Sequence, residues 1–168
     1  MLIFLIGMMG SGKTTLGRQL AQRLEYTFVD LDQYIVQQQQ RSIAEIFEQK
    51  GQDYFRMLER KALEELVAKY EQAVISTGGG APCFFDNINF INQRGQSVFL
   101  DVPVKTLTSR LIAQGQEERP LLKGKSEAEL LAFLSETLRY RKQFYDRATH
   151  VLEANEQYIE RIVQLLNL

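Results

Sequence analysis

The chain has 168 residues, of which 45% are hydrophobic, and this is enough for one domain with a substantial core. Its 20 lysines and arginines nearly balance its 21 aspartates and glutamates, so the formal net charge is −1 and we expect no nucleic-acid partner. The first apolar run starts at residue 2 and no run approaches the roughly 20 residues of a bilayer span, so we expect no targeting peptide, no membrane segment and a cytoplasmic location.

Short apolar runs alternate with longer stretches of helical periodicity along the chain. The expected strands are residues 2–6, 27–29, 73–76, 97–100 and 149–152. The expected helices are residues 13–24, 33–39, 43–50, 53–70, 87–94, 104–113, 127–147 and 157–167. Two of them start with a capping box, Ser42 with Glu45 and Ser126 with Glu129. This alternation predicts an α/β fold with a parallel sheet between helices, and binding groups at the carboxyl ends of the strands.

The first expected strand runs directly into a glycine-rich turn. Residues 7–14 read Gly-Met-Met-Gly-Ser-Gly-Lys-Thr, which matches every fixed position of a phosphate-binding P-loop. Bare glycines let successive N–H groups surround phosphate oxygens, Lys13 adds a charge for the outer phosphates, and Thr14 offers an oxygen to Mg²⁺. A glycine turn that serves only packing is the alternative. The buried strand before it and the amphipathic helix after it favour a nucleoside triphosphate site, although the loop alone does not identify the chemistry.

Two aspartates follow the second expected strand with period-two spacing. Asp30 and Asp32 can both face the crevice where the strand ends, one to organise the water around Mg²⁺ and the other to contact a substrate hydroxyl. For Asp30 the N-cap of the next helix is an open alternative. Asp101 also ends a strand, but Pro103 soon after it is typical of a helix start, so we leave Asp101 outside the site.

Three consecutive glycines, Gly78 to Gly80, follow the third expected strand. Their backbone entropy is costly, so something must require bare amides or unusual dihedral angles there. We interpret the segment as a second loop that contacts an anion or a substrate. A plain flexible turn explains it poorly, because a buried strand fixes one side and Pro82 stiffens the other.

Arginines supply further candidate groups, although each one taken singly is more often a surface residue. Arg56 and Glu59 are three residues apart on an expected helix, so Glu59 can hold the guanidinium in one orientation. Arg119 lies in a polar, glycine-containing segment, residues 114–126, which has the composition of a mobile lid that brings a cation over the phosphates.

Arg139 and Arg141 stand two residues apart on the following helix, so only one of them can face a site. We expect it to be Arg141, which shares a face with Tyr145.

Two other reactive side chains are expected to have structural roles. The single cysteine, Cys83, is expected to be a small buried residue rather than a nucleophile, and the lone histidine, His150, is expected to be structural.

In order and approximate spacing, these motifs resemble the shikimate kinase family over essentially the whole chain. The match covers the P-loop, the aspartate pair, Arg56 with Glu59, the triple glycine, the Arg-Pro-Leu-Leu segment at 119–122 and residues 141–145. The resemblance implies one domain over residues 1–168 with a three-layer P-loop kinase fold, in which helices flank a five-stranded parallel sheet of order 2-3-1-4-5. It further implies a P-loop at 7–15, a substrate-binding subdomain at about 32–60 and a lid at about 114–126.

The resemblance also implies a reaction: ATP with Mg²⁺ phosphorylates the 3-hydroxyl of shikimate, in the chorismate pathway to aromatic amino acids. We expect the protein to be a monomer. The implied catalytic residues are Lys13, Asp32 and Arg119. The implied nucleotide-binding residues are Gly10, Ser11, Gly12, Lys13, Thr14, Thr15, Arg110 and Arg119. The implied shikimate-binding residues are Asp32, Arg56, Gly78, Gly79, Gly80 and Arg141. The implied magnesium-site residues are Thr14, Asp30 and Ser76. Residues 153–156 lack the basic residue that some relatives place near adenine, which leaves part of the base contact open.

Two other functions compete with this interpretation. Another small-metabolite kinase of the same fold, such as a gluconate kinase, would share the P-loop but has no evident need for the triple glycine and two carboxylate-binding arginines. A regulatory module that binds nucleotide without phosphoryl transfer would have no use for Asp32, Arg119 and the substrate arginines. Assays with a panel of hydroxy acids separate the first rival, and shikimate-dependent ADP release excludes the second.

Overall fold

The structure, a computed structural model, describes residues 1–114 and 122–168 of the chain. Within this part, five strands form one sheet with the order β2-β3-β1-β4-β5. They are β1 (Leu2–Ile6), β2 (Thr27–Asp30), β3 (Ala73–Ser76), β4 (Gln96–Asp101) and β5 (His150–Glu153). All neighbours are parallel, and Leu5 of the central β1 pairs with Ser76 on one side and Val98 on the other. The expected sheet order is confirmed, with each strand boundary within one residue of its expected place.

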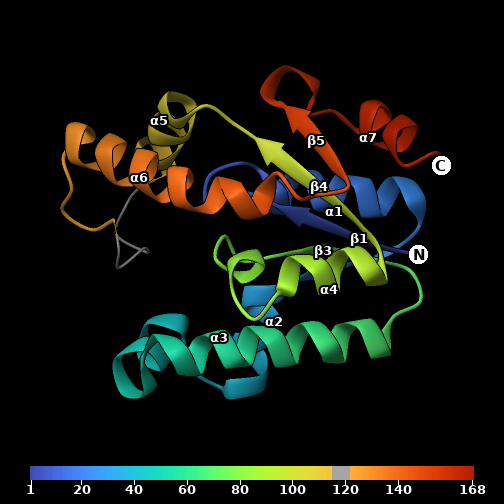
Figure 1. The fold of residues 1–168 in the computed structure, drawn as a ribbon, viewed down its shortest axis with the longest axis horizontal. Coiled ribbons are helices and arrows are strands. Elements are labelled where there is room, and N and C mark those ends of the chain that lie inside the picture. The colour runs from blue at the N-terminus through green and yellow to red at the C-terminus, as the bar shows by residue number, and fades with distance from the viewer. Residues whose placement is uncertain (115–121) are drawn as a thin grey trace.

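Helices flank this sheet (Figure 1). Those in the described part are α1 (Lys13–Leu24), α2 (Leu31–Gln39), α3 (Ile43–Lys69), α4 (Asn87–Arg94), α5 (Val104–Gln114), α6 (Glu127–Tyr145) and α7 (Ile159–Leu165), with short 3-10 turns η1 (Ala81–Cys83) and η2 (Ala154–Glu156). The strand arrows in Figure 1 point toward the end of the molecule where α5 and most of α6 lie. The carboxyl ends of the strands therefore open toward these helices. Among the described residues, no helix is long and apolar enough to cross a membrane.

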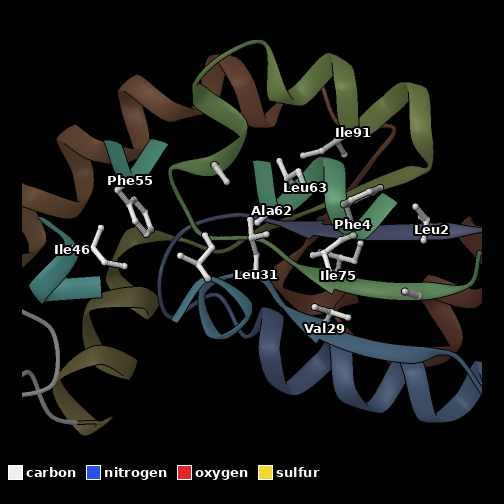
Figure 2. Packing of buried hydrophobic residues seen from close by; sticks show 14 residues of the cluster. Leu2, Phe4, Val29, Leu31, Ile46, Phe55, Ala62, Leu63, Ile75 and Ile91 are labelled. Carbon is white, nitrogen blue, oxygen red and sulfur yellow. The ribbon is translucent and has the colours of Figure 1, made fainter. Parts of the chain in front are cut away.

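Side chains of β1 alternate between the two faces of the sheet because successive residues of a strand point in opposite directions. Ile3 and Leu5 pack with residues of α1 and α7, whereas Phe4 packs with residues of α3. Figure 2 shows Phe4 and Ile75 of the sheet beside Leu63 of α3. Burial on both faces explains why β1 is apolar at every position.

Helix α3 joins two expected helices, residues 43–50 and 53–70, across a kink. Gly51 lies at this kink with φ 81° and ψ 176°, a left-handed φ that glycine adopts more readily than other residues. The two parts meet again beyond it, where the rings of Phe47 and Phe55 lie 4.8 Å apart. The kink thus sets the position of the helix turn that begins at Phe55 and carries the charged residues described next.

Both expected capping boxes, at Ser42 and at Ser126, are confirmed.

Candidate active site

The P-loop follows β1 and ends in α1. Gly7, Gly10 and Gly12 have φ values of 142°, 78° and 99°, so the turn depends on glycine at each of these positions. The Lys13 ammonium donates to the carbonyl oxygens of Gly7 and Met8 at 2.9 and 2.8 Å and is largely buried. The expected cradle is therefore a tightly coiled backbone with its lysine held against it.

The other expected nucleotide-binding residues lie at or next to this loop. The Ser11 side chain is buried, and Thr15 is exposed at the start of α1. From α5, Arg110 Nη1 donates to the carbonyl oxygens of Gly10 at 3.2 Å and Ser11 at 3.3 Å. These bonds place the Arg110 guanidinium beside the phosphate-binding turn. Arg119, together with residues 115–121 of the expected lid, lies outside the described residues.

Asp30 caps α2 and also contacts the end of the P-loop. Its Oδ1 accepts the N–H groups of Asp32 and Gln33 at 3.1 and 3.2 Å, which caps α2 and starts that helix two residues earlier than expected. Its Oδ2 accepts a hydrogen bond of 3.0 Å from the Thr14 hydroxyl at the end of the P-loop. Ser76 is buried on the neighbouring strand, in register with Asp30.

A hydroxyl and a carboxylate side by side are hard oxygen donors of the kind that Mg²⁺ prefers, so the Thr14 and Asp30 side chains fit that ion. In residues 1–114 and 122–168, no three acidic, histidine or cysteine side chains gather to form a protein-only metal cage. A Mg²⁺ ion at a phosphate site usually takes one or two protein ligands and otherwise water and phosphate oxygens. The Thr14 and Asp30 side chains match this pattern of one or two protein ligands.

Asp32, the second residue of α2, has a buried carboxylate oxygen without a partner among the described residues. Its Oδ1 is buried and makes no hydrogen bond with the described residues. Burial, followed by the negative charge of Asp30, raises the pKa of the Asp32 carboxyl above its usual range, although Lys13 and Arg56 oppose the change. A buried acceptor left free in this way calls for a ligand or a water molecule. Asp32 therefore marks the place where a ligand hydroxyl would bind.

The glycine loop, residues 78–80, is surrounded by charged side chains from three helices. A Cβ on Gly78 would lie 2.8 Å from Asp32 Oδ1, one on Gly79 would lie 2.8 Å from Arg141 Nη1, and one on Gly80 would lie 2.5 Å from Arg56 Nη1. None of the three glycines has a positive φ, so the idea that they serve unusual dihedral angles is wrong. Close approach is the reason for glycine here: each residue leaves room for a charged group, and Gly78 also for Glu59, whose Oε1 would lie 2.9 Å from a Cβ.

Arg56 is buried next to this loop on α3. Its Nη1 forms an ion pair of 2.6 Å with Glu59, and its guanidinium lies 4.4 Å from the centre of the Phe84 ring. Its Nε makes no hydrogen bond with the described residues. Glu59 thus holds the guanidinium in one orientation, as expected, and Phe84 is a contact that the sequence did not reveal.

Arg141 on α6 lines the same cavity as Arg56, with a volume of about 370 Å³ and Phe84 in its wall. Arg139, two residues earlier, is exposed and pairs with Glu136 at 3.7 Å on the surface. The structure therefore places the expected member of this arginine pair at the cavity. A guanidinium from α3 and one from α6 favour a carboxylate or another planar anion in this cavity, whose lining also includes the exposed carboxylate of Glu136.

The residues left outside the site have structural contacts. Asp101 pairs with Lys142 at 3.5 Å, and His150 Nε2 lies 2.7 Å from Gln96 Oε1 at the amino end of β5. Burial raises the pKa of the Cys83 thiol to about 11, which disfavours the reactive thiolate. A separate cavity of about 210 Å³ between α2 and α3 is lined by Tyr34 and other residues and does not include the groups described above.

Glu59 gives the folded protein a specific pH dependence. Burial raises the pKa of its carboxyl from 4.5 to about 7, outweighing the Arg56 charge that lowers it. Between these two pH values the folded protein holds a proton that the unfolded chain has released, so the Glu59 contribution to the free energy of unfolding falls as the pH rises. The loss is on the order of 3 kcal/mol.

Denaturant titrations of the wild-type protein and of Glu59→Gln between pH 4.5 and 7 measure this contribution. The variant has no such proton to lose, so its stability relative to wild type should increase across that range. Parallel stability curves for the two proteins would show that the Glu59 carboxyl is already ionised in the folded state near pH 4.5.

Comparison with known proteins identifies the family. A family model described as shikimate kinase matches residues 9–167. A shikimate kinase from Phocaeicola vulgatus is 46% identical over 162 residues, which are 96% of this chain and 91% of that protein. The crystal structure of shikimate kinase from Bacteroides thetaiotaomicron has a TM-score of 0.93 at 42% identity and covers 99% of this chain and 98% of its own. Shikimate kinase from Acinetobacter baumannii, solved with shikimate, has a TM-score of 0.87 at 35% identity and covers 99% of this chain and 92% of its own. The chain therefore belongs to the shikimate kinase family.

Proposed function

We propose that this protein transfers the γ-phosphoryl group of ATP to the 3-hydroxyl of shikimate, giving shikimate 3-phosphate and ADP. The observation that carries the proposal is the contact between two sites: a P-loop with its lysine, and a glycine loop lined by Asp32, Arg56 and Arg141. A Cβ on Gly79 would lie 3.4 Å from the carbonyl oxygen of Gly7, so the two loops lie next to each other. A nucleotide on one loop and a hydroxy acid on the other would therefore meet at their reacting groups.

Shikimate is a carboxylate with several hydroxyl groups, and the cavity together with the adjacent glycine loop and Asp32 offers partners for both kinds of group. Arg56 and Arg141 would bind the carboxylate, since both line the cavity and guanidinium groups suit it geometrically. The free oxygen of Asp32 would accept a hydrogen bond from the reacting hydroxyl and orient it or take its proton. The amides of Gly78, Gly79 and Gly80 would donate to the remaining substrate oxygens.

The nucleotide would occupy the P-loop, with its phosphates on the amides of Gly10, Ser11 and Gly12 and near the side chains of Thr14 and Thr15. Lys13 would stabilise the charge that spreads over the γ-phosphoryl oxygens during transfer, together with Arg119 from the segment proposed as a lid. Arg110 would lie on the adenosine side. When bound, Mg²⁺ neutralises charge on the β- and γ-phosphates, and Thr14, Asp30 and Ser76 are the residues that would hold it, the last two through water.

In the reaction, the oxygen of the shikimate 3-hydroxyl forms a bond to the γ-phosphorus while the bond from that phosphorus to the β,γ-bridging oxygen breaks. ADP leaves with that oxygen, and the hydroxyl proton is released toward Asp32 or solvent. Residues from about 32 to 60 would act as the substrate-binding part of a single, monomeric domain and residues from about 114 to 126 as its lid. Closure over both substrates would keep water from competing with the hydroxyl.

A coupled assay for ADP with purified protein, ATP and Mg²⁺ tests the proposal. ADP release should require shikimate and should not be supported by gluconate or other hydroxy acids at the same concentration. Turnover with gluconate in preference to shikimate would assign the protein to another small-metabolite kinase. Nucleotide binding without any acceptor-dependent ADP release would indicate a regulatory module instead.

A further inference from the structure

Every carbonyl oxygen of the glycine loop accepts a hydrogen bond. The N–H of Ala81 donates to Gly78 O at 3.1 Å, and the N–H of Cys83 donates to the carbonyl of residue 80 at 2.9 Å. The third carbonyl, Gly79 O, accepts a bond of 2.6 Å from the hydroxyl of Tyr145. The loop's three N–H groups, in contrast, donate to no acceptor within residues 1–114 and 122–168. With its acceptors occupied, the loop offers donors to a ligand.

Tyr145 is the side chain that completes this pattern, and it comes from the last residue of α6. Its side chain is fully buried, and its ring packs against Phe99 with 5.0 Å between the ring centres. The same hydroxyl lies 3.8 Å from the Met8 sulfur in the P-loop. Tyr145 therefore touches the backbone of the glycine loop and a side chain of the P-loop with one atom.

The position of Tyr145 on α6 links it to the proposed carboxylate site. Arg141 lies four residues earlier, so both side chains project from one face of the helix. Both reach the same glycine: the tyrosine hydroxyl bonds Gly79 O, and Arg141 Nη1 lies 2.8 Å from the place of a Cβ on that residue. One turn of α6 thus holds the Arg141 guanidinium, the proposed carboxylate-binding group, at a fixed distance from the Gly79 peptide.

We propose that Tyr145 is a positioning residue for phosphoryl transfer, whose hydroxyl holds the Gly79–Gly80 peptide so that the loop amides face shikimate beside the P-loop. This inference rests on the proposed function and extends it to a residue that makes no contact with substrate itself. Because the Gly79 carbonyl and the Gly80 N–H belong to one planar peptide group, fixing the carbonyl also fixes the direction of that N–H. Loss of the hydroxyl would leave a carbonyl with no donor and let the peptide turn.

The Tyr145 phenol keeps its proton at neutral pH, as tyrosine ordinarily does, and burial raises its pKa further above the usual range against the opposing charge of Arg141. It is therefore a permanent donor. A buried tyrosine can also serve the core alone, and in that case removing its oxygen would lower stability without changing how shikimate binds. The positioning role predicts a change in the KM for shikimate and in kcat, whereas the core role predicts a change in stability alone.

Tyr145→Phe keeps the ring and removes only the oxygen. We expect the KM for shikimate to rise about tenfold and kcat to fall, with the KM for ATP within twofold of wild type. A tenfold change corresponds to about 1.4 kcal/mol. A shikimate KM and kcat within twofold of wild type would overturn the proposal.

Ser97→Ala is the matched control for a lost buried hydroxyl. Ser97 is fully buried at the start of β4, at the opposite end of the sheet from the glycine loop. Its hydroxyl accepts the N–H of Thr149 at 2.8 Å and donates to Asn92 Oδ1 at 2.5 Å. We expect this variant to lower Tm at least as much as Tyr145→Phe while leaving both KM values unchanged. An equal rise of the shikimate KM in both variants would assign the effect to stability and overturn the proposal.

A measurement without substrate separates this inference from the proposed function. In the ligand-free protein, the backbone amide resonances of Gly79 and Gly80 should shift in Tyr145→Phe and should not shift in Ser97→Ala. Unchanged resonances in Tyr145→Phe would overturn the positioning role alone. Wild-type protein that releases no ADP with shikimate would overturn the proposed function and with it the role of Tyr145 in phosphoryl transfer, even if the amide shifts show that Tyr145 holds the glycine loop.

Discussion

Lys13→Met is expected to reduce the kcat for shikimate phosphorylation by about a thousandfold or more, which corresponds to roughly 4 kcal/mol of lost transition-state stabilisation. Methionine has nearly the length of lysine but carries no charge and cannot donate a hydrogen bond. The phosphoryl group in transfer spreads negative charge over its equatorial oxygens, and a cation placed beside them is one of the few groups the protein contributes to this chemistry. The variant removes that cation.

The same substitution also has a local structural effect. In the wild-type protein the ammonium donates to the carbonyls of Gly7 and Met8, so methionine leaves two carbonyls of the P-loop without this donor. We expect a modest fall in Tm with the sheet and helices intact, because the loop conformation also depends on its three positive-φ glycines. Circular dichroism together with the coupled assay separates loss of chemistry from loss of fold.

Lys61→Met is a suitable control for Lys13→Met. Lys61 is an exposed lysine on α3 that pairs only at the surface with Glu65, at 3.7 Å. Exposed pairs of this kind contribute little, so the control should keep both turnover and stability. Turnover of Lys13→Met within tenfold of wild type would contradict the role given to Lys13.

The parts of this molecule that depend on short stretches of sequence could be predicted. The P-loop needs only its own glycines and the strand and helix beside it, and each capping box joins residues three apart, so both are visible as local patterns. The order of the strands came from the family resemblance rather than from any local pattern. The break between the two expected helices coincides with the kink at Gly51, but a break in the pattern does not show how the two parts pack against each other.

The contacts that shape the candidate site could not be predicted from local patterns, because they join distant segments. Tyr145 and Gly79 are 66 residues apart, and nothing near either one indicates the hydrogen bond between them. The spacing of Arg141 and Tyr145 was the available signal, since residues four apart share a helix face. The glycine loop was noticed for its composition, but the reason for it, a charged side chain against each glycine, required the arrangement of α2, α3 and α6.

Arg56→Ala is expected to weaken shikimate binding by about 2 kcal/mol or more, a factor of roughly thirty in Kd. The Arg56 side chain is only 10% exposed, so its interaction with a carboxylate is screened little by water. Calorimetric titration of shikimate into the ATP-free protein measures the loss directly. Arg139→Ala removes an exposed arginine of α6 and should leave the affinity unchanged. Affinity of Arg56→Ala within threefold of wild type would exclude the proposed carboxylate contact.

Arg56→Ala has a second effect, because it also removes the ion-pair partner of Glu59. Without the guanidinium, the Glu59 carboxyl remains buried near Asp32, and its pKa should rise above the value of about 7 in the wild-type protein. Arg56→Ala combined with Glu59→Gln removes the unpaired acid together with its partner. If the double variant recovers stability while shikimate still binds roughly thirtyfold more weakly, the weakening comes from the missing carboxylate contact. If affinity recovers with stability, Arg56 acts by holding Glu59 and α3 in place, and Arg141 alone binds the carboxylate.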